Sequence, residues 1–354
     1  MTEVAVWILH PEAPPTAGPL ERLLSDARLA LAERHRGGFL AAGAADARIV
    51  SGPPDDTTFG ARLRELVRAE RPAGVVVLGS GALALATPAD RRAFVTVAAS
   101  GAPRALANNR FSADAIAVGC AERLVDVPDL ATDNALPRWL EEVAGYQLRD
   151  LRGRWRLAMD LDSPLDVALL GEADPTLEPV GRRLDAFAAV AADRRAEIVI
   201  SGRTNAAMVG WLERHAAARV RALVEERGLR AAARLRGPAA AGVPPQRPPR
   251  SVLGMVLDRN GPGALGERLA ELGDAALVDS RVLLAHRLAA DETRWPPAED
   301  RFASDLLLAD RVADPWLREL TAAAASAPIP IVLGGHSLVG PGARLTVGRG
   351  SDGS

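Results

Sequence analysis

The stretch that most constrains the fold is 74–90, where an apolar run ends in a glycine-rich turn. Four aliphatic residues at 75–78 are typical of a strand buried on both faces of a parallel sheet. The turn at 79–81 contains only glycine and serine, and Thr87 and Asp90 then have the pattern of a helix N-terminus. Because ligands in open α/β sheets bind beyond the carboxyl ends of the strands, this turn is the first candidate site.

The rest of the chain alternates apolar runs, which indicate strands, with stretches of helical periodicity. Further strands are predicted over 4–9, 47–50, 105–106, 115–118, 197–200, 252–257, 275–278 and 329–333. Helices are predicted over 19–36, 59–71, 89–100, 136–144, 165–170, 180–194, 204–227, 264–272, 281–288 and 315–325. This alternation predicts an α/β fold, with a mostly parallel sheet that carries helices on both faces.

The length of 354 residues exceeds the usual size of one hydrophobic core, so two domains are expected. The polar segment 171–178 marks the predicted boundary, which gives an α/β domain at 1–174 and a second α/β domain at 175–354. Within the second domain, the Pro- and Ala-rich segment 237–250 is predicted to be a mobile loop or linker. The tail at 348–354 is predicted to be disordered.

The composition excludes several classes of function. A net charge of -2 gives no general attraction to nucleic acid or to an anionic membrane, and the apolar runs are far shorter than the ~20 residues that span a bilayer. The start of the chain has no signal-peptide pattern, so we expect a cytoplasmic protein; its oligomeric state is left open. The single Cys120 excludes an internal disulfide. All 43 basic residues are arginine, which excludes phosphate binding by lysine and any lysine Schiff base.

Three polar loops in the first half contain residue types that bind nucleotides and metals. The first is Gly79-Ser80-Gly81, the second begins with Asn108 and Asn109, and the third contains Asp160 and Asp162. With their flanks, VLGSGALALATPAD and MDLDSPLDV, these loops resemble the nucleotide-diphospho-sugar transferase fold of the GT-A type. The molybdenum-cofactor and phospholactate guanylyltransferases are the most similar members, and the resemblance covers roughly the first 170 residues.

The resemblance implies transfer of a nucleotidyl group to a small phosphorylated or sugar-like acceptor. It implies that Asp160 and Asp162 hold Mg²⁺, that the glycine turn admits the nucleotide, and that Asn108 and Asn109 orient it. The sequence departs from the family in two places: the N-terminal glycine-rich phosphate loop has no match, and Gly-Ala-Leu-Ala stands at 81–84, where a metal-binding aspartate is typical. These departures favour the alternative of a nucleotide- or sugar-phosphate-binding or regulatory protein without catalysis.

Purely structural roles explain some of the same residues. Asp162 precedes a predicted helix start and is a candidate helix cap, and the two asparagines suit a tight turn that needs a positive φ.

The second half offers one further binding hypothesis. The loop after the strand at 197–200 contains Arg203 before a predicted helix, a place where backbone amides bind phosphate or carboxylate. The glycine-rich loop after the strand at 329–333 contains His336, and both loops are expected to face one pocket for a small anion. The alternative is that both loops only turn the chain, with Thr204 as the helix cap.

Overall fold

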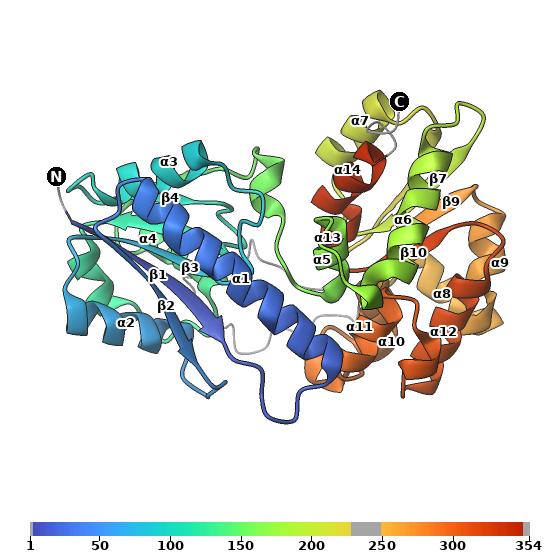
Figure 1. The fold of residues 1–354 in the computed structure, drawn as a ribbon, viewed down its shortest axis with the longest axis horizontal. Helices are drawn as coiled ribbons and strands as arrows, with labels where there is room; N and C mark the ends of the chain where they lie inside the picture. The colour runs from blue at the N-terminus through green and yellow to red at the C-terminus, as the bar shows by residue number, and fades with distance from the viewer. Residues whose placement is uncertain (1–2, 228–248, 350–354) are drawn as a thin grey trace, which may run out of the picture. The chain divides into compact units, whose positions relative to one another are not determined.

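The computed structural model describes residues 3–227 and 249–349 (Figure 1). The described residues form two compact units, of which unit 1 contains 3–16 and 25–161, and unit 2 contains 17–24, 162–227 and 249–349. Each unit has its own sheet, so the predicted α/β class is confirmed. The units divide the chain after Leu161, and the polar segment 171–178 lies within unit 2. No helix among the described residues is long and apolar enough to cross a membrane.

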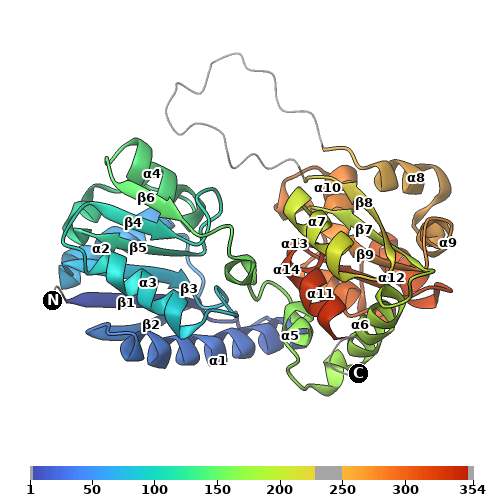
Figure 2. The same cartoon turned by 90° about the horizontal axis from the view of Figure 1, so that it is seen from above.

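Unit 1 contains a six-stranded sheet in the order β2-β1-β3-β5-β4-β6 (Figure 2). Only β5 runs antiparallel to its neighbours β3 and β4; the other pairs are parallel. The strands are β1 Val4–Pro11, β2 Asp46–Gly52, β3 Gly74–Gly79, β4 Arg104–Ala107, β5 Ala115–Gly119 and β6 Gln147–Asp150. The helices are α1 Pro19–Ala41, whose first residues group with unit 2, α2 Phe59–Glu70, α3 Pro88–Ala98 and α4 Leu136–Glu142.

The two faces of this sheet are covered by different helices. On one face, Val6 and Val76 pack in a core with residues of α1 and α3. On the other face, Trp7 and Val75 pack with residues of α2 and α4. Adjacent residues of one strand thus enter opposite cores, which explains why the central strands are apolar throughout rather than alternating.

Unit 2 contains a fully parallel four-stranded sheet in the order β10-β9-β7-β8. The strands are β7 Glu197–Gly202, β8 Arg219–Val224, β9 Ala275–Asp279 and β10 Ile331–Gly334. The longer helices are α6 Glu178–Ala191, α7 Ala206–His215, α8 Val252–Asn260, α10 Ser280–Leu288, α11 Ala298–Asp305, α12 Pro315–Ser326 and α14 Pro341–Gly348. Three shorter ones are α5 Pro164–Leu169, α9 Leu265–Ala270 and α13 His336–Val339. Helix α6 packs against β7, β9 and β10.

Two sequence-based element assignments in this unit were wrong. The predicted strand at 252–257 is helix α8, which begins at the cap Ser251, whose side chain accepts a hydrogen bond from Gly254 N–H at 2.9 Å. The predicted helix at 204–227 is α7 followed by edge strand β8, where arginines alternate with apolar residues in the two-residue period of a strand.

Two other predictions fall partly outside the described residues. Of the linker predicted over 237–250, the residues up to 248 lie outside them. Of the tail predicted over 348–354, Gly348 ends α14 and is therefore ordered in a helix, whereas 350–354 lie outside the described part of the chain.

Candidate functional site

Both sheets reverse their strand order at their first strand. In unit 1, β1 lies between β2 and β3, and in unit 2, β7 lies between β8 and β9. The connections from such a strand leave in opposite directions, so a crevice opens beyond its carboxyl end, and this is where open α/β sheets bind ligands. The two candidate sites are therefore the carboxyl ends of β1 and β3 and the carboxyl ends of β7 and β9.

At the carboxyl ends of β1 and β3, the side chains of a histidine and a serine are in contact. His10 lies near the end of β1, Ser80 directly follows β3, and the imidazole Nδ1 is 3.1 Å from the hydroxyl oxygen. Both side chains are buried, and Ser80 N–H donates to the carbonyl of Leu9. Burial lowers the pKa of His10, and the positive charge of Arg28 lowers it further. The ring is therefore neutral at pH 7, and in the tautomer with its proton on Nε2 it accepts a hydrogen bond from the Ser80 hydroxyl.

The two glycines of the turn that follows β3 have different surroundings. A Cβ on Gly81 would lie 2.9 Å from the carbonyl oxygen of Leu161 and 3.1 Å from Nε of Arg28, so close packing requires glycine there. A Cβ on Gly79 would meet no atom within 4 Å. Gly79 therefore borders open space beside the His10–Ser80 pair, whereas Gly81 fills a packing role.

Asp160 lies at the same turn. Its Oδ1 accepts a hydrogen bond from Leu83 N–H at 3.2 Å, and Leu83 has a left-handed backbone with φ of 56°. Leu161 N–H donates to the carbonyl of Gly81 at 2.9 Å, which ties the two segments together. Asp160 is only 8% exposed. The carboxylate predicted from the sequence is thus placed at the carboxyl edge of the first sheet.

Asn108 and Asn109 lie at this edge too, but the amide of Asn108 is bound within the fold. Its Nδ2 donates to the Asp114 carboxylate at 3.0 Å and to the Leu157 carbonyl at 3.1 Å, and its Oδ1 accepts from two backbone amides. Asn109 Oδ1 accepts from the amide two residues later, as in a tight turn. These contacts are structural, but neither asparagine has the positive φ that the tight-turn alternative predicted. Their nucleotide role stays a prediction.

Asp162 belongs to unit 2, whereas Asp160 belongs to unit 1. Asp162 is exposed and does not cap the following helix; Ser163 is the N-cap of α5. The Asp166 carboxylate accepts hydrogen bonds from Asp162 N–H at 2.9 Å and from Ser163 N–H at 2.8 Å. Among 3–227 and 249–349, no group of three or more His, Cys, Asp or Glu side chains could hold a metal ion. The two aspartates predicted to hold Mg²⁺ fall into different units, and their role as metal ligands stays a prediction.

At the second switch point an arginine and an aspartate form an ion pair. Arg203 follows β7 and donates from Nε to Asp279 at 2.6 Å, from Nη2 at 3.1 Å and from its backbone N–H at 3.3 Å. Asp279 ends β9 and its side chain is fully buried. Gly202 has φ of 127°, and a Cβ there would lie 2.2 Å from Cβ of Asp279. A glycine is therefore required where the two strand ends approach each other.

The predicted helix cap in this loop was off by one residue. Asn205, not Thr204, is the N-cap of α7, and its Oδ1 accepts from Met208 N–H at 2.9 Å. Thr204 is buried beside it.

The loop after β10 lies at the same edge of the second sheet. The parallel register places Gly334 opposite Asp279, so β9 stands between the two glycine-rich loops. A Cβ on Gly334 would lie 2.5 Å from the Leu165 side chain, whereas Gly335 borders open space. His336 is partly exposed at the start of α13. The two loops share one edge with the end of β9 between them, and α13 packs back against both β9 and β7.

Sequence reasoning missed His10 and Asp279 as site residues. Both lie at the carboxyl ends of strands that the sequence predicted correctly, and this position is the signal by which they could have been identified.

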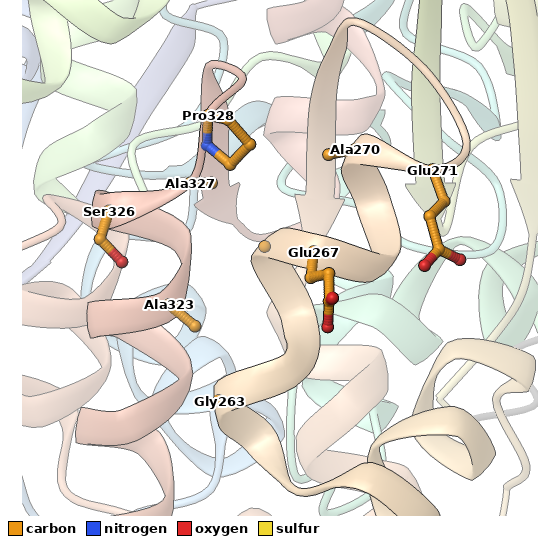
Figure 3. A pocket seen from close by; sticks show the side chains of 9 residues that line it. Gly263, Glu267, Ala270, Glu271, Ala323, Ser326, Ala327 and Pro328 are labelled. Atoms are coloured by element: carbon orange, nitrogen blue, oxygen red, sulfur yellow. The ribbon is translucent and has the colours of Figure 1, made fainter.

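A shallow groove of about 470 Å³ lies between α9 and α12 and is lined by small residues, Glu267 and Glu271 (Figure 3). Its residues precede β9 and β10, so it lies at the amino edge of the second sheet, away from the candidate sites.

No known protein family model and no curated protein matches this chain. The functional argument therefore rests on the geometry of the two switch points.

Proposed function

We propose that unit 1 binds a nucleotide or a sugar phosphate at the switch point between β1 and β3. The observation that carries this proposal is the open space at Gly79 beside the buried His10–Ser80 pair. A base or sugar ring can approach the backbone there because glycine has no side chain in the way. The ligand classes are those that the sequence resemblance implies.

The charge near this space supports an anionic ligand. Burial lowers the pKa of His10 most, and the positive charge of Arg28 lowers it further, although the carboxylates of Glu12 and Asp26 act in the opposite direction. Arg28 is thus a positive charge that acts on the His10 ring. Gly79 N–H and Ser80 N–H donate to the carbonyls of Asp114 and Leu9, so these two amides are already used. Recognition of phosphate in this proposal therefore comes from Arg28 and the His10–Ser80 pair, since the chain has no lysine.

Nucleotidyl transfer is a second candidate, and the position of Asp160 favours it. In this reaction an oxygen of a phosphorylated acceptor attacks the α-phosphorus of a nucleoside triphosphate. The bond from the α-phosphorus to the bridging oxygen breaks, and pyrophosphate leaves. Because no group of three or more metal-ligating side chains lies among the described residues, Mg²⁺ enters this proposal as the ion that accompanies the triphosphate.

Calorimetric titration of the full-length protein tests the binding proposal. The probes are GTP, ATP, CTP and glucose 1-phosphate, each with and without millimolar Mg²⁺. In the variant Gly79→Leu the new side chain enters the open space, so we expect at least tenfold weaker binding with little change in melting temperature. Gly52→Leu is the matched control, because Gly52 ends the edge strand β2 and also borders open space. Equal affinity in the two variants, or no binding of any probe, contradicts the proposal.

Asp160→Asn separates binding from transfer. Asparagine keeps an Oδ1 acceptor for Leu83 N–H but removes the charge. If unit 1 transfers nucleotidyl groups, this variant retains nucleotide binding and loses Mg²⁺-dependent release of pyrophosphate in the presence of phosphorylated acceptors. Absence of pyrophosphate release by the unmodified protein with every acceptor leaves binding as the function.

A further inference from the structure

Two buried hydroxyl groups in unit 2 have no hydrogen-bond partner among the residues that the structure describes. They are Oγ1 of Thr204 and Oγ of Ser337. Thr204 is 7% exposed and Ser337 is 2% exposed. Buried hydroxyls in folded proteins are nearly always satisfied, so an unpartnered one indicates a place for a group that is not part of the chain.

The two hydroxyls come from different elements at one edge of the second sheet. Thr204 lies in the loop between β7 and α7, and Ser337 lies in α13, which directly follows β10 and packs against both β7 and β9. Figure 1 shows α14 next to α7 and α13 beyond it, and α14 contacts both α7 and α13. The carboxyl ends of β7 and β9, where the strand order reverses, therefore lie beside both hydroxyls.

An arginine paired with the buried carboxylate of Asp279 lies next to Thr204. Asp279 accepts three hydrogen bonds from Arg203, which hold the guanidinium in one orientation. One fifth of the Arg203 side chain remains exposed, so it can contact a ligand while it keeps its partner. The neighbouring N-terminus of α7, a helix of ten residues, is exposed at Ala206 and Ala207, whose amides have no acceptor within the helix.

We propose that this switch point in unit 2 binds a phosphate monoester. The phosphate accepts hydrogen bonds from the hydroxyls of Thr204 and Ser337, from Arg203 and from the first amides of α7. Hydroxyls, a fork-shaped guanidinium and a helix N-terminus together form the donor set that phosphate prefers. The organic part of the ligand lies in the open space at Gly335. This site is separate from the one proposed in unit 1 and requires no residue of that unit.

The test compares variants that delete one hydroxyl each from the full-length protein. Thr204→Val keeps the side-chain shape, and Ser337→Ala removes one atom. Thr321→Val is the matched control, because Thr321 is fully buried in the same unit but its hydroxyl donates to the Leu317 carbonyl and forms a second hydrogen bond with Ser304 Oγ. The probes for calorimetry are inorganic phosphate, ribose 5-phosphate, glucose 6-phosphate and, as a carboxylate, citrate.

We expect ribose 5-phosphate or glucose 6-phosphate to bind, and both hydroxyl variants to weaken that binding at least fivefold. Their melting temperatures stay equal to or above that of the unmodified protein, because the deleted hydroxyls have no partner in the chain. Thr321→Val shows the opposite pattern, with a lower melting temperature and unchanged affinity. If the esters bind more tightly than inorganic phosphate, the result supports a monoester as the ligand. If only inorganic phosphate binds, the site takes the free ion and the monoester proposal is wrong.

Three results overturn the proposal. The first is that no phosphate compound binds at millimolar concentration. The second is that both Thr204→Val and Ser337→Ala bind the phosphate compounds as tightly as the unmodified protein does. The third is that citrate binds more tightly than every phosphate compound. Gly79→Leu separates this proposal from the one for unit 1, because it leaves phosphate binding at this site intact whether or not unit 1 binds nucleotides.

Discussion

Arg281 and Asp305 form a two-point ion pair in the interior of unit 2. Nη2 of Arg281 donates to Oδ2 of Asp305 at 2.6 Å, and Nη1 donates to Oδ1 and to the hydroxyl of Ser280. The arginine side chain is 10% exposed and the aspartate side chain is fully buried. The pair joins α10, which follows β9, to the end of α11, so it supports the strand end that carries Asp279.

Removing one member of this pair is expected to destabilise the protein strongly. Asp305→Ala leaves a buried guanidinium without its partner, and such a change costs roughly 3–5 kcal/mol. The double variant Arg281→Met, Asp305→Leu removes both charges and is expected to be more stable than the single variant. Urea denaturation followed by tryptophan fluorescence measures both. If the double variant is no more stable than Asp305→Ala, the unpaired charge of Arg281 is not the cause of the lost stability.

The stability of unit 2 is expected to fall as the pH rises toward neutrality because of Asp166. Burial, together with the nearby charge of Asp162, raises the pKa of Asp166 to about 7. The unfolded carboxyl titrates near ~4, so between about pH 4 and pH 7 the folded form holds a proton that the unfolded form has lost. The stabilisation is complete below pH 4 and disappears by pH 7, with an upper bound of about 4 kcal/mol.

Hydrogen exchange of unit 2 peptides across this pH range measures the effect. Asp166→Asn keeps an acceptor for the Ser163 amide and is expected to flatten the pH dependence. Asp162→Asn removes the repelling charge and shifts the transition to lower pH. The carboxylate of Asp305 raises the pKa of buried Arg281 most, and those of Asp279 and Asp166 raise it further, so the charge of Asp166 also acts on Arg281. An unchanged pH profile in Asp166→Asn would falsify this prediction.

Unit 1 is expected to respond to pH in the opposite direction through His35. Burial lowers the pKa of His35 to about 4, and its Nε2 lies 2.8 Å from the carbonyl oxygen of Ala82. Arg91 approaches the other ring nitrogen at 3.4 Å, an arrangement that a neutral ring satisfies. Unfolded histidine titrates near ~6.5, so the folded unit lacks a proton between pH 6.5 and pH 4 and loses about 3 kcal/mol as the pH falls.

His35→Gln tests this, because glutamine can still donate to the Ala82 carbonyl but does not titrate. After correction for the intrinsic pH dependence of exchange, the stability of unit 1 should then vary less between pH 4 and 6.5, with the remaining change due to His10, whose pKa is also lowered. Peptides of unit 2 should behave as before. An identical acid sensitivity of unit 1 in the variant would show that other groups are responsible.

Local patterns were sufficient to predict the central strand and the helix after it. The predicted start of α3 is confirmed as a capping box, in which Thr87 Oγ1 accepts from Asp90 N–H and Asp90 accepts from Thr87 N–H at 2.9 Å. The run at 252–257 was misassigned because a short apolar run fits a buried strand and a buried helix equally well. The cap Ser251 was the local signal that distinguishes the two.

The sequence identified only one residue of the pair at each candidate site, because the two residues of each pair are far apart in the chain. Ser80 was recognised from its glycine turn, but its partner His10 is 70 residues away. Arg203 was recognised from its position before a helix, but Asp279 is 76 residues away. Which strands become neighbours depends on the strand order of the whole sheet, and no local pattern contains that information.

The approach of β7 to β9 at Gly202 leads to a final prediction. Gly202→Ala places a methyl group 2.2 Å from Cβ of Asp279 on a backbone with φ of 127°. The left-handed backbone alone costs roughly 1–3 kcal/mol for a residue with a side chain, and the clash adds to this cost. We expect a loss of at least ~2 kcal/mol in urea denaturation and displacement of Asp279 from Arg203.

Gly335→Ala is the control for this prediction, because Gly335 lies at the same edge with open space around it and an extended backbone with φ of -101°. Its stability should stay within about 0.5 kcal/mol of the unmodified protein, as for most surface substitutions. If Gly202→Ala unfolds at the same urea concentration as Gly335→Ala, the strand ends at this switch point are not in the close contact that holds Arg203 in place.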